Sequence, residues 1–292
     1  MIYYFLPDPG IAGGVKVAFQ FLEALTQLGV RAVAALPGTQ APQWFTSSVA
    51  VVNRKTALQN LTARDHAIIT WPPDYEILRE KKAKLVFHCQ GVENLDAILR
   101  DKDIFILTCW EDTKNLAREK YGRESVMVGI SVSTCFFERQ VPKKDNRVTY
   151  MPRRGLKHAL KCLKIKGLDF EPLDGLSEGQ VALKMQQAGI YLATSVGEDF
   201  GLPALEAMAA GCLVVSVPVL GGMEYLTHSQ NAIIAETENL ASALFEITRP
   251  GKTEQRELLR QRAVATAHNY HPRLLKNRLS RLLQNELREF VQ

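Results

Sequence analysis

The sequence lacks the features of a membrane-spanning protein, a disulfide-stabilised secreted scaffold or a zinc site. No stretch approaches the roughly 18 apolar residues that a spanning helix needs. The N-terminal MIYYFLPDPG has no basic region before its short apolar run, so it does not resemble a signal peptide. The five cysteines are scattered and form no CxxC pair. We therefore expect a cytoplasmic protein with reduced thiols.

The excess of one charge over the other is also small. The chain has 36 Lys and Arg residues against 31 Asp and Glu residues, which gives a net charge of +5. So small an excess predicts no nucleic-acid partner. One local exception runs from Arg147 to Lys166, with seven basic residues and no acidic one. This run fits a solvated helix face. It also fits a surface for phosphate or anionic lipid, so peripheral contact with the inner face of a membrane stays open.

Two ligand motifs are missing as well. Neither half of the chain contains GxGxxG, which argues against a Rossmann dehydrogenase. No DxD-type motif stands in a suitable loop, so we expect that no metal is required and that no cofactor is bound.

What the sequence does contain is an alternation of short apolar runs and helical patterns. Residues 2–6 (IYYFL) predict a buried strand, the residues from Val15 a helix, and Val30–Leu36 the next strand. A strand, a glycine loop, a helix and a strand are typical of a βαβ unit in a parallel sheet. The alternation restarts at Val148–Met151, after the polar segment 139–147.

The length of 292 residues fits two domains of about 100–200 residues each. We predict two Rossmann-like parallel-sheet domains, residues 1–143 and 144–275, that face a central cleft. The last segment, 276–292, is predicted to be a helix that could pack back across the domains. In such sheets, ligands bind at the carboxyl ends of the strands.

The most informative segment is Thr194–Gly211, TSVGEDFGLPALEAMAAG, which follows a predicted strand and enters a helix. Pro203 suits a first helical position, and a helix N-terminus favours anions. Glu198 on the loop and Glu206 on the first helical turn can converge on a single ligand. Carboxylates of this kind accept hydrogen bonds from the vicinal hydroxyls of a sugar or a ribose.

The string EDFGLPALEAMAAGCLVV at 198–215 resembles the signature of glycosyltransferase family four, the glycogen-synthase-like group 1 of retaining GT-B enzymes. The resemblance resumes at the segment 221–224, GGME. It implies a GT-B fold in which Glu198 binds hydroxyls of the donor sugar and Glu206 binds the ribose. Asp199 stands where the family usually has Gly, which adds a carboxylate near the donor.

The same resemblance implies which residues contact the donor diphosphate. The backbone N–H groups of Phe200, Gly201 and Leu202 would contact it at the helix N-terminus. The family also places an Arg and a Lys after the first strand of the second domain, where this chain has Arg153 and Arg154, with Lys157 behind them. A guanidinium fork suits phosphate oxygens. Because the usual Arg-to-Lys spacing is absent, surface arginines remain the alternative.

Two candidates lie in the first domain. Gly13 and Gly14 open a helix and can bring backbone N–H groups close to a phosphate, although a tight turn explains them equally well. The loop resembles the family's first loop, which closes over the donor phosphates. His88 ends a predicted strand where the family often carries a histidine in the cleft, so it is a catalytic candidate beside a structural alternative.

The resemblance implies a retaining transferase that moves a sugar from a nucleotide-sugar donor to a glycan, polysaccharide or lipid-linked acceptor. Glu198, His88, Arg153 and Arg154 are the catalytic candidates. Two alternatives stay open: a non-catalytic GT-B partner subunit or nucleotide-binding module, and a GT-B sugar-nucleotide epimerase. The intact pair of glutamates favours the transferase over the first alternative. Product analysis separates it from the second, because epimerisation leaves the nucleotide on the sugar.

Overall fold

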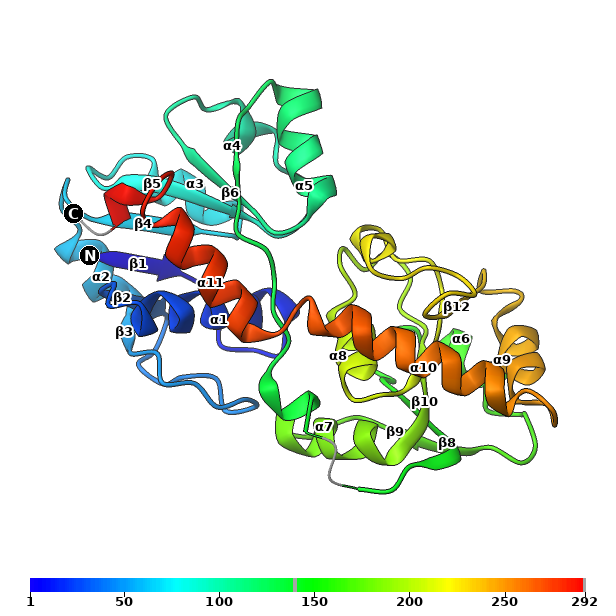
Figure 1. The fold of residues 1–292 in the computed structure, drawn as a ribbon. Coiled ribbons are helices and arrows are strands. Elements are labelled where there is room, and N and C mark those ends of the chain that lie inside the picture. Colours follow the sequence, from blue (N-terminus) through cyan, green and yellow to red (C-terminus); the bar gives the residue numbers. More distant parts are fainter. Residues whose placement is uncertain (139–140, 291–292) are drawn as a thin grey trace. The chain divides into compact units, whose positions relative to one another are not determined.

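In the computed structural model, which describes residues 1–138 and 141–290, the chain forms two compact units (Figure 1). The first unit consists of Met1–Ser131 and Pro272–Gln292, and the second is Val132–His271. Each unit is built on one sheet whose strand pairs are all parallel. The predicted fold class, α/β with two Rossmann-like parallel-sheet domains, is confirmed.

The chain enters the second unit after Ser131, twelve residues before the boundary expected at 143/144. The contacts of the intervening segment explain this difference. Ser133 Oγ donates to the Glu178 carboxylate at 2.6 Å, and Gln186 Nε2 donates to the carbonyl oxygen of Cys135 at 2.7 Å. The expected linker, 139–147, includes residues 139–140, which lie outside the described part of the chain, and its last residues begin an inner strand of the second sheet.

Seven parallel strands form the sheet of the first unit, in the order β3-β2-β1-β4-β5-β6-β7. The inner strands are apolar because helices cover the faces of a parallel sheet. The strands are β1 (Ile2–Phe5), β2 (Ala32–Leu36), β3 (Val51–Asn53), β4 (His66–Ile69), β5 (Lys84–Cys89), β6 (Phe105–Thr108) and β7 (Val126–Met127).

The last helix of the chain belongs to the first unit and packs on its first helix (Figure 1). Leu275 and Leu279 join the same core as Phe19 and Leu22, which gives the C-terminal segment an anchor in this unit. The helices are α1 (Gly13–Gln27), α2 (Arg54–Asn60), α3 (Pro73–Leu78), α4 (Asp96–Arg100), α5 (Glu111–Asn115), η1 (Leu116–Lys120), α11 (Pro272–Leu282) and η4 (Arg288–Phe290).

The second unit has a five-stranded parallel sheet in the order β12-β11-β10-β8-β9. Its strands are β8 (Lys144–Tyr150), β9 (Asp169–Pro172), β10 (Ala188–Ala193), β11 (Leu213–Ser216) and β12 (Ile233–Ile234). Its helices are η2 (Thr134–Phe136), α6 (Leu156–Cys162), α7 (Glu178–Gln187), α8 (Leu202–Ala209), η3 (Gly221–Glu224), α9 (Leu240–Thr248) and α10 (Thr253–His268).

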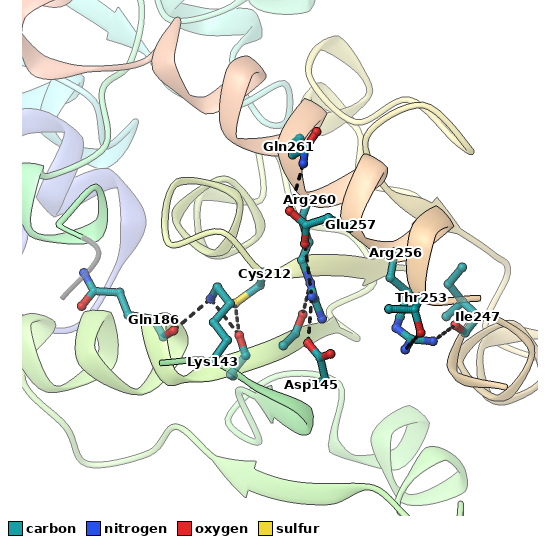
Figure 2. Close-up of polar contacts among 12 residues, drawn as sticks. Lys143, Asp145, Gln186, Cys212, Ile247, Thr253, Arg256, Glu257, Arg260 and Gln261 are labelled. Carbon is teal, nitrogen blue, oxygen red and sulfur yellow. Dashed lines mark hydrogen bonds and ion pairs between the residues drawn. The ribbon is translucent and has the colours of Figure 1, made fainter. Parts of the chain in front are cut away.

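Two basic side chains hold the amino ends of the central strands in this sheet, as Figure 2 shows. Lys143 Nζ donates to the carbonyl oxygens of Gln186 and Ala188, each at 2.9 Å, at the end of α7. Arg260 of α10 donates to the carbonyl oxygen of Gly189 at 3.1 Å and pairs with Asp145 at 2.8 Å. The bonds of Lys143 satisfy carbonyls at the end of α7, which otherwise lack intrahelical partners, and those of Arg260 join β10 to β8.

Within the described residues, no helix combines the length and the apolar character that crossing a bilayer requires.

Candidate functional site

The site forms where β8 and β10 end side by side. Leu192 pairs with Tyr150 in the parallel register, so the loops after the two strands leave the same edge of the sheet. Gly155, in the first loop, has a φ of 77°, and a Cβ atom at this position would collide with the carbonyl group of Thr194 in the second loop. Only glycine therefore permits the two loops to pack this closely.

A pocket opens at this edge and collects four of the predicted residues. Arg153 and Arg154 come from the loop after β8, and Glu198 and Gly201 from the loop after β10. Tyr191 on β10 lines the same pocket, together with the first residues of α8. The structure thus brings residues about 45 positions apart in the chain into one cavity with both a cationic and an anionic wall.

Arg154 and Glu198 face each other across this pocket. Arg154 Nη1 lies 2.9 Å from Glu198 Oε1, and the side chains are 59% and 20% exposed. An ion pair with this much solvent access contributes little to stability, about 0.2–1 kcal/mol. A ligand can therefore replace either partner with little loss of free energy. An anion can bind the guanidinium, and hydroxyl groups can bind the carboxylate.

The turn before α8 is held by backbone packing. Gly201 has a φ of 74°, and a Cβ atom there would lie 2.9 Å from Val219 Cγ1. The Tyr225 hydroxyl donates to the carbonyl oxygen of Gly201 at 2.6 Å, and the Gly221 amide donates to that of Asp199 at 2.5 Å. These contacts fix the N-terminus of α8, with its partial positive charge, at the pocket.

Glu206 lies one helical turn beyond Pro203 and is only 5% exposed. The negative charges of Glu206 and Glu198 both affect the pKa of Tyr191. Burial raises the pKa of the Tyr191 phenol well above its usual value, and the two carboxylates raise it further. Tyr191 therefore keeps its proton and can donate a hydrogen bond into the pocket. Sequence reasoning missed this residue because a tyrosine within an apolar strand reads as core.

The other predicted residues of the second unit contribute in different ways. The Phe200 ring packs against Tyr225, with ring centroids 5.2 Å apart, and the Leu202 side chain is buried, so these two residues can offer a ligand their backbone alone. Asp199 is half-buried in the loop. Lys157 is exposed on the first turn of α6 and does not line the pocket.

His88 is wholly buried in the first unit, at the end of β5. Its Nδ1 lies 2.9 Å from the Tyr4 hydroxyl and its Nε2 lies 3.1 Å from Cys109 Sγ. Gln90 Nε2 donates to the Tyr4 oxygen at 2.9 Å, so Tyr4 links Gln90 to the histidine.

Burial lowers the pKa of His88 to about 3, which keeps the ring neutral at physiological pH. The catalytic candidate of the first unit is therefore enclosed, and Tyr4 and Gln90 connect it to the start of α1. A Cβ atom on Gly14 would lie 2.8 Å from Gln90 Oε1, whereas one on Gly13 would meet nothing within 4 Å. A side chain at position 14 would therefore displace the end of Gln90, whereas position 13 has open space.

Among the residues that the structure describes, no cluster of three or more His, Cys, Asp or Glu side chains could hold a metal ion.

Comparison with known protein families gives a match that lies within the second unit. Residues 157–263 match the family model described as glycosyl transferases group 1. A search of curated protein sequences gave no significant match.

Solved structures resemble the whole chain. Sucrose-phosphate synthase from Thermosynechococcus elongatus superposes with a TM-score of 0.74 at 13% identity, covering 98% of this chain and 99% of that chain. HepE from Anabaena, solved with UDP-glucose, gives 0.74 at 13% identity, covering 97% and 99%. A glycosyltransferase from Rickettsia africae ESF-5 gives 0.72 at 14%, covering 98% of each chain. At these identities the likeness shows the fold, which is GT-B.

The contact of Gly155 with Thr194 generates the first prediction. Gly155→Ala should cost about 2–5 kcal/mol, from the positive φ and the collision with backbone. Gly167→Ala is the matched control, because Gly167 has a φ of 86° but open space at its Cβ position, and it should cost about 1–2 kcal/mol. Scanning calorimetry measures both. Equal losses would show that the loops do not need this close approach.

The neutral His88 generates a second prediction. Its pKa in the folded state, about 3, lies below the ordinary 6.5, so the unfolded chain binds more protons between these values. The free energy of unfolding should therefore fall with decreasing pH below 6.5, by up to about 1.4 kcal/mol per pH unit from this residue. His88→Gln should reduce that slope. The control His158→Gln, which replaces a half-buried histidine of α6, should leave it unchanged.

Tryptophan fluorescence in urea measures this effect selectively, because Trp44, Trp71 and Trp110 all lie in the first unit. A His88→Gln protein with the pH slope of the wild type would contradict the buried neutral imidazole.

Proposed function

We propose that this chain, whose residues 157–263 match the family model described as glycosyl transferases group 1, is a retaining transferase. Its donor would be a nucleoside-diphosphate sugar, and its acceptor a glycan, a polysaccharide or a lipid-linked sugar. The observation that carries the proposal is the pocket in which Arg153, Arg154 and Glu198 meet the N-terminus of α8. It combines groups for a diphosphate with a carboxylate for hydroxyl groups.

In the proposed complex, Arg153 and Arg154 hold the diphosphate together with the N–H groups at the start of α8. Lys157 on α6 is a further proposed phosphate contact, and the backbone at Gly13 and Gly14 is a proposed phosphate-binding loop of the first unit. The acceptor oxygen forms a bond to the anomeric carbon while the bond to the diphosphate oxygen breaks on the same face, so configuration is retained. The proton of the acceptor hydroxyl passes to the leaving diphosphate. The cations stabilise the charge that develops on the leaving diphosphate.

Glu206 holds the ribose and Glu198 the sugar hydroxyls in this proposal, with Asp199 beside them. We propose no metal and no further cofactor, because the arginines and the helix N-terminus supply the positive charge. His88 acts through Tyr4 and Gln90 on the acceptor side. We place the protein in the cytoplasm, with peripheral contact at the inner face of a membrane when the acceptor is lipid-linked.

Donor binding requires Arg154 to exchange partners. Without a ligand, its guanidinium is paired with Glu198 at 2.9 Å. A diphosphate competes for the guanidinium, and Glu198 then needs the sugar hydroxyls as its new donors. A nucleoside diphosphate without sugar leaves this carboxylate unpaired beside a phosphate. The exchange thus favours the intact donor over the nucleotide product, which assists product release.

Nucleotide binding provides the central test. UDP is the first candidate, because HepE was solved with UDP and with UDP-glucose, and GDP and ADP are compared with it. At about 100 times its dissociation constant, the correct nucleotide should stabilise the fold by about 2.7 kcal/mol, measured as a thermal shift. Glu206→Gln should abolish most of this shift, and Glu236→Gln, an exposed carboxylate of the same unit, should leave it unchanged.

No shift with any nucleotide would contradict the donor site. Binding of a UDP-sugar without turnover would favour a nucleotide-binding module, and a new UDP-sugar product would favour an epimerase.

The exchange of partners by Arg154 makes a separate prediction. Glu198→Gln should bind UDP up to about fivefold more tightly than the wild type, because an exposed ion pair of about 1 kcal/mol or less no longer competes. The same variant should bind UDP-glucose more weakly, because an amide accepts fewer hydroxyl hydrogen bonds than a carboxylate. Isothermal titration calorimetry measures both affinities. Unchanged or weaker UDP binding would rule out the competition by Glu198.

A further inference from the structure

The outer face of α6 has an unusual composition for a surface helix. Ala159 and Cys162 are buried against the sheet. The opposite side presents Leu156 and Leu160, which are 43% and 51% exposed. These leucines are four residues apart and lie on one side of the helix. Single exposed leucines are ordinary, but two on the same face form an apolar strip.

Two lysines lie beside this strip. Lys161 is exposed on α6, and Lys164 is exposed two residues beyond the end of the helix at Cys162. No acidic residue occurs in the chain from Arg147 to Lys166. The outer face of α6 with Lys164 therefore alternates apolar and cationic side chains, and the lysine stems extend the apolar strip while their charged ends reach water.

The acidic residue Glu238 lies near this face, outside the helix. Glu238 has a pKa below its usual value, chiefly because Thr237 donates a hydrogen bond to it and, to a smaller extent, because of the charges of Lys161 and His158. It lies in the turn before α9 and offsets a single positive charge. The charge of the face remains positive.

A face of this kind complements the interface of an anionic bilayer. Apolar side chains enter the boundary between headgroups and acyl chains, and the lysines meet the lipid phosphates. A face that only had to remain solvated would gain nothing from leucines beside the lysines. A face that bound a small phosphate in water would not need the apolar strip.

We propose that the outer face of α6 with Lys164 is the surface on which this protein docks to an anionic membrane. Arg153 and Arg154 line the pocket and directly precede this helix. Docking would thus hold the pocket close to the lipid headgroups, where the sugar of a lipid-linked acceptor is presented. The consequence for the acceptor rests on the proposed function, whereas the docking itself does not.

Vesicle binding by the full chain tests the proposal. The protein is sedimented with phosphatidylcholine vesicles that contain or lack phosphatidylglycerol, and should bind only those that contain it, less at high salt. Lys161→Gln/Lys164→Gln should lower the partition coefficient about thirtyfold. Leu156→Ser/Leu160→Ser should lower it on the order of tenfold, and Leu160→Glu should give a similar loss.

Matched controls remove the same groups elsewhere. Lys81→Gln/Lys82→Gln removes two exposed lysines from the first unit, and Leu183→Ser/Leu258→Ser removes two leucines that are 45% and 46% exposed on other helices. Both should bind vesicles as the wild type does.

The proposal is overturned if the wild type ignores anionic vesicles, if the controls lose as much binding as the α6 variants, or if the leucine variants bind normally. Binding of single-stranded nucleic acid with the same dependence on Lys161 and Lys164, in place of vesicle binding, also overturns it. Calorimetry with UDP separates the two proposals. Lys161→Gln/Lys164→Gln should keep its nucleotide affinity, and failure of nucleotide binding leaves the vesicle result untouched.

Discussion

The close contact between the loops after β8 and β10 is the constraint on which the candidate site depends. These adjacent parallel strands deliver a cationic loop and an acidic loop to the same edge of the sheet. The absence of a side chain at Gly155 lets the loops touch at Thr194. The pairing of Arg154 with Glu198 follows from this contact, because both residues lie within four positions of it. The charges of the pocket are thus positioned by backbone packing, and a weak ion pair can open without unfolding the site.

The main constraint in the first unit is that a polar side chain is buried in an apolar core. His88 is enclosed, and burial of an imidazolium would be costly, so the ring stays neutral and is satisfied by Tyr4 and Cys109. Gln90 extends this chain of contacts, because it donates a hydrogen bond to Tyr4. Gln90 lies beside Gly14 at the start of α1. A change in the surroundings of Gln90 would therefore alter the hydrogen bonding of His88 through Tyr4.

The sequence predicted the inner elements well because their patterns are strong. Glycine loops, apolar strands and the string from Glu198 onward identified both sheets and the loop that carries the pocket. The strands β3, β9 and β12 were not predicted, since they lie toward the sheet edges, are only two to four residues long and have partly exposed residues. The start of β8 resembled a linker because its first residues are charged or polar and exposed. Tyr191 and the pairing of Arg154 with Glu198 depend on contacts between distant segments, which no local pattern records.

The basic run from Arg147 to Lys166 shows how the fold gives one stretch of sequence three different roles. Arg147 pairs with Asp169 at 3.0 Å and with Glu171 at 3.3 Å, so its charge is used between β8 and β9. Arg154 faces Glu198 in the pocket. The lysines that follow lie on the outer face of α6, beside leucines. A count of charges along the chain cannot distinguish these roles, because each depends on which acidic residues the fold brings near. The part of the run that combines exposed lysines with exposed leucines is the part that suits an external anionic surface.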